Sequence, residues 1–176
     1  ETITVEPVGF PTREPMLAEG NVDAITGFSF SSFLNLVRLG VPEDDIKIIL
    51  MADHGLSLYG NAVIANTAFA EENPEKVTGF LRAVAKGWTD VIADPAAGAA
   101  MVAERNPAID LALEERRLRM AIDANVLTDY VAANGMGGID AARMTQALAQ
   151  LAENFEFSTP PTAEAIYTDA YLPTDG

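Results

Sequence analysis

The stretch that most constrains the fold of this chain lies at residues 17–36, whose sequence is LAEGNVDAITGFSFSSFLNL. It predicts the end of a helix, a tight turn at Gly20, a short strand at residues 22–26, and a turn at Gly27 into a new helix. The strand is apolar and bounded by glycines, which favours a strand covered on both faces. We therefore expect an α/β fold in which this strand belongs to an open sheet.

Three serines and two phenylalanines follow the end of that strand. One of Ser29, Ser31 and Ser32 is expected to cap the next helix, which would leave hydroxyls and free N–H groups at the carboxyl edge of the sheet. Open α/β sheets bind ligands at this edge, and the starts of helices favour anionic groups. Phe28 and Phe30 would supply apolar walls. An ordinary turn between a strand and a helix explains the motif equally well.

The order of predicted elements divides the chain into two regions. Short apolar or β-branched runs predict strands at residues 2–8, 22–26, 46–51 and 61–66. Helical patterns alternate with the first three strands, which argues for a sheet with parallel pairs. Later segments predict helices that start at Asn73-Pro74, Asp94-Pro95, Asp110 and Asp140. We expect residues 1–58 to form an α/β region and residues 59–176 to form a mainly helical region with one strand.

The composition excludes several classes of function. The chain has 26 acidic and 11 basic residues, a formal net charge of -15, so nucleic acid and anionic membrane surfaces are not expected partners. It has no cysteine and a single histidine, which excludes disulfides, thiolate catalysis and zinc centres built from several histidines. No run of apolar residues approaches the ~18 that a membrane span requires. We predict neither a metal site nor a cofactor.

A possible enzymatic site involves Ser29 and the single histidine, His54. A strand, a serine and a helix in succession resemble the G-x-S-x-G nucleophile elbow, but Ser31 stands where the second glycine should be. His54 follows the predicted third strand and could bind a ligand or respond to pH. The more common explanation is a histidine whose hydrogen bonds are satisfied within a loop. A binding function is therefore favoured over a serine hydrolase.

Two other motifs carry weaker predictions. Tyr59, Gly60 and Asn61 lie between the two regions, where an aromatic face, a flexible glycine and an amide suit a hinge that contacts a ligand. A simple crossover with a tyrosine in the core is the alternative. Arg116, Arg117 and Arg119 form a short basic run among acidic residues, which is typical of a solvated helix face.

Several segments together resemble a known family. The sequence REPMLAEGNVDA at residues 13–24 is similar to an element of periplasmic substrate-binding proteins, in the branch that serves importers of nitrate, sulfonates, taurine and thiamine-pyrimidine precursors. The sequence NPEKVTGFLRA at residues 73–83 resembles a helix of the same family. Residues 94–96 and 167–173 are similar to its C-terminal signatures. The resemblance runs nearly from end to end and in the same order.

The resemblance implies a periplasmic-binding-protein-like fold of type II, with two α/β lobes around a ligand cleft. Such proteins are about twice as long, so this chain would be the C-terminal half. Residues 1–58 would end the far lobe and residues 59–176 would return to the near lobe. An N-terminal half, or a second chain, is then expected to cover the exposed core.

The resemblance also implies a function. The protein would capture a small nutrient in the cleft by hinge closure, without chemistry, and deliver it to an ABC permease in the periplasm. The loop at residues 28–32 and the crossover at residues 59–61 would face the ligand, with His54 a weaker candidate. A cytosolic enzyme of pyrimidine synthesis is a further alternative, but it would need clustered histidines and cysteines that this chain lacks.

Overall fold

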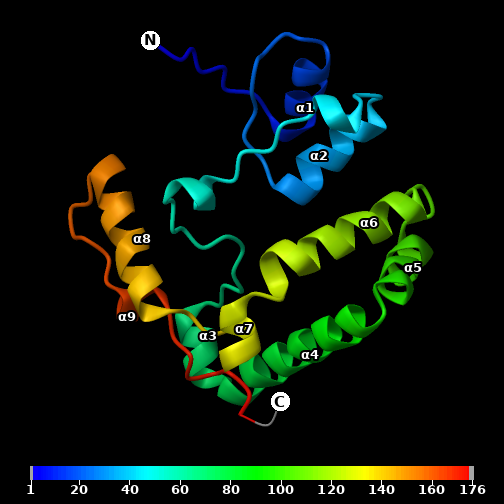
Figure 1. Cartoon of the computed structure of the whole chain (residues 1–176). Helices are drawn as coiled ribbons and strands as arrows, with labels where there is room; N and C mark the ends of the chain where they lie inside the picture. The colour runs from blue at the N-terminus through cyan, green and yellow to red at the C-terminus, as the bar shows by residue number, and fades with distance from the viewer. Residues whose placement is uncertain (1, 175–176) are drawn as a thin grey trace.

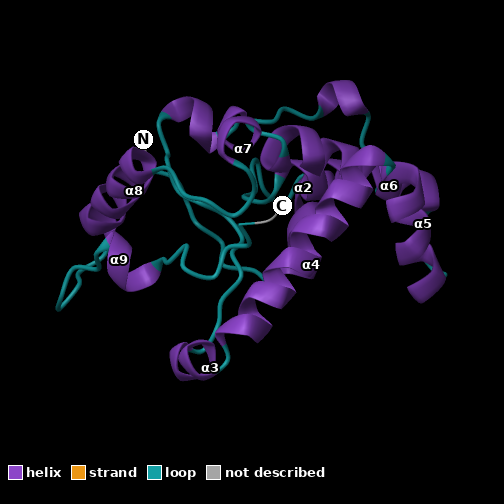
Figure 2. Cartoon of the chain, turned by 90° about the horizontal axis from the view of Figure 1, so that it is seen from below, coloured by secondary structure: helices purple, strands orange, loops and turns teal. Residues whose placement is uncertain are grey.

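The computed structural model describes residues 2–174 and consists of helices joined by loops (Figures 1 and 2). The α-helices are α1 (Phe10–Ala18), α2 (Ser29–Arg38), α3 (Thr67–Glu72), α4 (Pro74–Ala93), α5 (Pro95–Arg105), α6 (Leu111–Ala121), α7 (Asp129–Asn134), α8 (Ala141–Asn154) and α9 (Ala163–Ile166). Short 3₁₀ helices are η1 (Glu43–Asp45) and η2 (Met51–His54), and a π-helical turn, η3 (Ile122–Val126), continues α6. None of the described residues lies in a strand.

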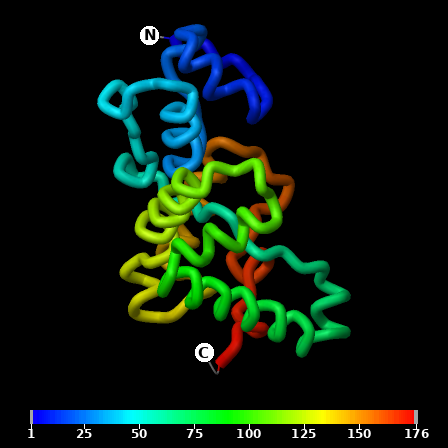
Figure 3. The backbone as a smooth tube through the Cα atoms, turned by 90° about the vertical axis from the view of Figure 1, so that its right-hand side faces the viewer, coloured from blue at the N-terminus to red at the C-terminus, as the bar shows by residue number. Residues whose placement is uncertain are grey.

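Helix-on-helix packing builds most of the tertiary structure. Helices α4, α5 and α6 follow one another as a bent array, α2 packs on α6, and α1 packs on α2 (Figure 1). Helices α8 and α9 form a separate pair. The described chain begins and ends at opposite ends of the molecule (Figure 3). Leu34 of α2 is fully buried, and Leu36 beside it is 3% exposed, so the contact surface of α2 is a centre of the apolar core.

Three aspartates start helices as their sequence pattern predicts. The side chains of Asp94, Asp110 and Asp140 each accept a hydrogen bond from the backbone N–H three residues later, at 3.0, 3.1 and 2.6 Å. Each bond satisfies one of the N–H groups that a helix leaves without a partner in its first turn. The predictions that α5, α6 and α8 begin at these residues are therefore confirmed.

The predicted cap at the start of α2 is wrong. The residue before the first turn is Phe28, and no side chain caps the helix. Ser29 and Ser31 already lie within the helix, and the hydroxyl of Ser32 bonds Glu14 instead of the helix backbone. A buried carboxylate is a stronger acceptor than the local backbone, which explains why the serine bonds to it.

The predicted strands at residues 2–8, 22–26, 46–51 and 61–66 are not found in the part of the chain that the structure describes. A strand exists only when a neighbouring strand completes its hydrogen-bond ladder. No backbone hydrogen bond among the described residues joins two of these four segments. The apolar pattern is present, but the pairing that would convert it into a sheet is not.

Exposure of the same segments agrees with this account. Ile49 is 67% exposed and Ile64 is 91% exposed, so neither segment is covered on both faces. The structure therefore does not confirm the α/β class or the two lobes. The division into residues 1–58 and 59–176 stays a prediction, and its ends, residue 1 and residues 175–176, lie outside the described residues. No helix among those described has both the length and the apolarity to cross a membrane.

An ion pair connects α6 to the short helix η1. The guanidinium of Arg116 donates two hydrogen bonds to the carboxylate of Glu43, at 2.6 and 2.7 Å. Hydrogen bonding to the charged form holds the pKa of Glu43 below its ordinary value of 4.5. The interaction therefore stabilises the fold fully above the pKa of Glu43 in the unfolded chain, and it is lost as the pH falls through the lowered pKa.

The substitution Arg116→Gln tests this pair. It should raise the pKa of Glu43 back toward 4.5, because the fork of donors is removed and an amide cannot replace it. An NMR titration of the Glu43 carboxyl in both proteins measures the shift. Equal pKa values in the two proteins would contradict the pairing.

Candidate functional site

The candidate ligand loop, residues 28–32, begins with a stacked pair of aromatic rings. The rings of Phe28 and Phe30 lie 5.4 Å apart between centroids and are inclined by only 16°. Phe28 is 50% exposed, whereas Phe30 is half-buried. The pair therefore presents a flat apolar surface to solvent at the start of α2, which suits a planar ligand.

Contacts from α1 hold the other side of the loop. Ser32 donates a hydrogen bond of 2.8 Å to Glu14, and both residues are buried. Arg13 donates to the backbone carbonyl of Thr26 at 2.7 Å, and its guanidinium lies 3.8 Å from the Glu14 carboxylate. Gly27 leaves room for this arrangement, because an added Cβ would overlap the Ser32 hydroxyl and displace it. The Ser32 hydroxyl therefore lies in the protein interior, bonded to Glu14, and is not free to bind a ligand.

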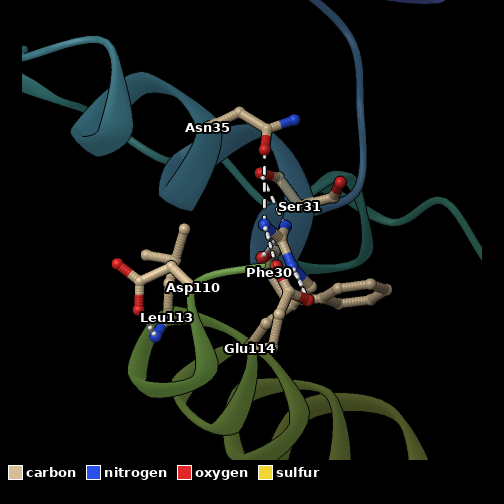
Figure 4. A network of polar contacts seen from close by, with 7 residues as sticks. Phe30, Ser31, Asn35, Asp110, Leu113 and Glu114 are labelled. Carbon is tan, nitrogen blue, oxygen red and sulfur yellow. Dashed lines mark hydrogen bonds and ion pairs between the residues drawn. The ribbon is translucent and has the colours of Figure 1, made fainter. Parts of the chain in front are cut away.

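Contacts from α6 hold the first turn of α2. Arg117 donates to the backbone carbonyls of Phe30 and Ser31, each at 3.2 Å, and to the side-chain oxygen of Asn35 at 3.3 Å. Glu114 orients the same guanidinium through bonds of 2.9 and 3.2 Å, as Figure 4 shows from close by. Ser29 and Ser31 are half-buried next to this contact.

Sequence reasoning missed Arg117 as a residue of the site. The basic run at residues 116–119 predicted a solvated helix face, which Arg116 and Arg119 fit, since each pairs with an acidic residue at the surface. Arg117 points instead toward α2, more than eighty residues earlier in the chain. The spacing of three residues between Glu114 and Arg117 indicates an ion pair along the helix. Nothing in the sequence indicates that Arg117 also bonds α2.

The crossover at residues 59–61 is held by α8. The phenol oxygen of Tyr59 accepts a hydrogen bond from the backbone N–H of Asp140 at 2.9 Å, and the guanidinium of Arg143 lies 4.3 Å from the centre of its ring. Arg143 also donates to the backbone carbonyls of the two residues before Tyr59, at 3.1 and 2.9 Å. Gly60 and Asn61 are exposed. Tyr59 is therefore anchored, with one lone pair of its hydroxyl in use.

A second tyrosine lies close to the same anchor. Tyr167 donates to the backbone carbonyl of Gly137 at 3.2 Å. Burial raises the pKa of Tyr167, and the charge of Asp169 and the nearby phenols of Tyr130 and Tyr59 add to the rise. The glycine-rich loop after α7 therefore lies beside Tyr167, whose phenol remains neutral at physiological pH.

His54 is exposed at the end of η2. Among the described residues, no hydrogen bond or ion pair joins it to Ser29, so the contacts of a catalytic triad are not formed. Likewise, no hydrogen bond, ion pair or ring contact within residues 2–174 joins the loop at residues 28–32 to the crossover at residues 59–61. The two candidate clusters contact different helices. The loop at residues 28–32 is held by α1 and α6, whereas the crossover at residues 59–61 is held by α8.

No three metal-binding side chains come together within the described part of the chain. The loop at residues 28–32 offers a stacked pair of rings, of which that of Phe28 is exposed, beside two half-buried hydroxyls. The crossover offers an anchored phenol beside an exposed amide. Such groups bind and orient a small planar molecule through stacking and hydrogen bonds.

The chain belongs to the family described as "NMT1/THI5 like", whose model matches residues 1–98, more than half of the chain. This family has a periplasmic-binding-protein-like fold, and its members are mostly binding proteins. The chain is therefore related to the substrate-binding proteins of ABC importers, which bind small ligands.

Two curated proteins are similar to the chain. The riboflavin-binding protein RibY of Chloroflexus aurantiacus is 26% identical over 176 aligned residues, which cover 97% of this chain and 48% of RibY. The 4-amino-5-hydroxymethyl-2-methylpyrimidine phosphate synthase of Aspergillus parasiticus is 34% identical over 89 residues, 46% of this chain and 26% of the synthase. The chain thus spans about half the length of RibY. No solved structure matches it.

Proposed function

We propose that this chain is part of the solute-binding component of an ABC importer. The observation that carries the proposal is the alignment of 97% of the chain with a riboflavin-binding protein, together with the family match. A binding role also agrees with the absence of a contact between Ser29 and His54 among the described residues. A hydrolase would need that contact or a substitute for it.

For the ligand we propose a planar, nitrogen-containing aromatic molecule, with riboflavin as the first candidate. The two curated relatives are named for riboflavin and for a methylpyrimidine, which share a flat heteroaromatic ring. The stacked rings of Phe28 and Phe30 favour such a ligand over nitrate or an alkylsulfonate. Hydroxyls of Ser29 and Ser31 and the amide of Asn61 would supply hydrogen bonds to its polar edge.

In the proposed mechanism, two lobes close on the ligand and a permease recognises the closed form. Residues 1–58 would belong to the far lobe and residues 59–176 to the near lobe, with the remaining half of the cleft supplied by polypeptide outside this chain. Tyr59, anchored by α8, would be the pivot of the crossover. The protein would act in the periplasm.

Riboflavin fluorescence tests the proposal directly. Titrating riboflavin with the protein should quench its fluorescence saturably, because the ring would stack on the phenylalanine pair. Bound ligand should also stabilise the fold, by about 2.7 kcal/mol at a concentration of 100 Kd. The second ligand to test is the methylpyrimidine, whose binding would be detected as a rise in the temperature of thermal unfolding. No saturable response to either molecule would overturn the proposed ligand class.

A matched pair of variants locates the binding site. Phe28→Ala should weaken the quenching markedly, since it removes the exposed ring of the stack. Phe155→Ala is the control, because Phe155 is 60% exposed and lies 6.3 Å from the ring of Phe157 in another aromatic pair. Equal binding by both variants would show that the ligand does not use the loop at residues 28–32.

A further inference from the structure

Arg117 binds α2 through two backbone carbonyls and one side chain. Two of its acceptors, the carbonyls of Phe30 and Ser31, belong to the first turn of the helix, and the third, Asn35, lies one turn later. A carbonyl oxygen has two lone pairs, so each can accept a bond from Arg117 while it also serves the helix. This contact therefore fixes where the first turn of α2 lies relative to α6 (Figure 4).

Glu114 fixes the orientation of the Arg117 guanidinium. It accepts from both Nε and Nη2 of Arg117, which leaves Nη1 aimed at the two carbonyls of α2. The side chains of Arg117 and Glu114 are only 20% and 28% exposed, so water competes weakly for these bonds. A bidentate fork of this kind cannot be reproduced by a lysine.

A hollow next to the Arg117 contact gives a reason why the position of α2 must be fixed. A space of about 180 Å³ is lined by Phe30, by Val102 of α5 and by Leu118 of α6, with Arg117 and Glu114 at its wall. Phe30 therefore borders an apolar space that Phe28 does not line. If the backbone of α2 were free to shift, the ring of Phe30 could move into the hollow and leave the stack.

We propose that Arg117 is the positioning residue of the ligand loop: by holding the first turn of α2 against α6, it keeps Phe30 stacked on Phe28 in the geometry that a planar ligand requires. The residue acts through its hydrogen bonds to α2 and does not touch the ligand. This inference rests on the proposed function for its binding readout, but its structural content can be measured without any ligand.

The first test compares neighbouring arginines on α6. Arg117→Gln should weaken riboflavin binding by about tenfold, because charged hydrogen bonds to the loop are lost. Arg116→Gln makes the same change of charge one residue away and should leave affinity unchanged, since Arg116 bonds Glu43 outside the loop. Arg117→Lys keeps the charge but should bind as weakly as Arg117→Gln. Full binding by Arg117→Gln or by Arg117→Lys would overturn the proposal.

A double variant separates positioning from general stability. In a Phe30→Leu background, which has no ring to position, Arg117→Gln should cause no further loss of affinity. A role confined to stability would lower affinity by the same factor in both backgrounds, and that result would overturn the proposal.

Amide hydrogen exchange provides the readout that needs no ligand. The amides of residues 29–35 should exchange about tenfold faster in Arg117→Gln than in Arg116→Gln, because the first turn of α2 opens more often. If the wild-type protein does not bind riboflavin, the proposed ligand fails while this comparison still decides the positioning claim. Equal exchange in the two variants would overturn it.

Discussion

Replacing Gly27 with alanine is expected to lower the free energy of unfolding by about 3 kcal/mol. An added Cβ would overlap the Ser32 hydroxyl and lie 3.2 Å from Ser32 Cβ, so this side chain must move. Moving the Ser32 side chain breaks its hydrogen bond of 2.8 Å to Glu14, a residue that is only 5% exposed. This loss of stability is larger than the ~0.4–1 kcal/mol of stabilisation that alanine provides by restricting the conformations of the unfolded chain.

Urea unfolding followed by circular dichroism measures this effect, with Gly87→Ala as the control. Gly87 lies in the exposed part of α4 with open space around it, so that substitution should raise stability by about 0.5–1 kcal/mol. In a Ser32→Ala background, Gly27→Ala should cost less than about 1 kcal/mol, because the overlapping hydroxyl is gone. A full loss in that background would mean that the overlap is not the cause.

Replacing Leu34 with alanine is expected to cost about 3 kcal/mol, within the range for buried leucines. Leu34 is fully buried on α2, the helix that packs against both α1 and α6. The cost combines the lost transfer of the side chain from water with the cavity that remains. Because α2 carries the ligand loop, the variant should also loosen the stacked phenylalanines.

Leu39→Ala is the matched control for Leu34→Ala. It removes the same atoms at the end of the same helix, but Leu39 is 47% exposed and leaves no closed cavity. Its expected cost is below about 1 kcal/mol. Both values come from urea unfolding curves. Equal costs for the two variants would show that Leu34 is not the centre of the core that its burial indicates.

The local features of the chain could be predicted because their causes lie within a few residues. Asp94, Asp110 and Asp140 cap helices because an aspartate before a helical pattern can reach the N–H three residues on. The helix that starts after Asn73, α4, forms as its periodicity predicts, since that period is a property of consecutive residues.

Long-range features could not be predicted in this way. The apolar runs at residues 46–51 and 61–66 have the composition of strands, but a strand depends on a neighbour that lies elsewhere in the chain or outside it. The role of Ser32 depended on Glu14, and the role of Arg117 on carbonyls of α2, across separations of 18 and 86 or more residues.

The sequence by itself determined where helices α4, α5, α6 and α8 begin, the acidic character of the chain, and the family to which its motifs point. Only the tertiary structure decided that Ser32 faces inward, that Tyr59 is anchored by α8, and that Arg117 grips the start of α2. The physical reason is range: caps and periodicity act between residues a turn apart, whereas burial, pairing and side-chain anchors depend on which distant segments the packing of helices brings together.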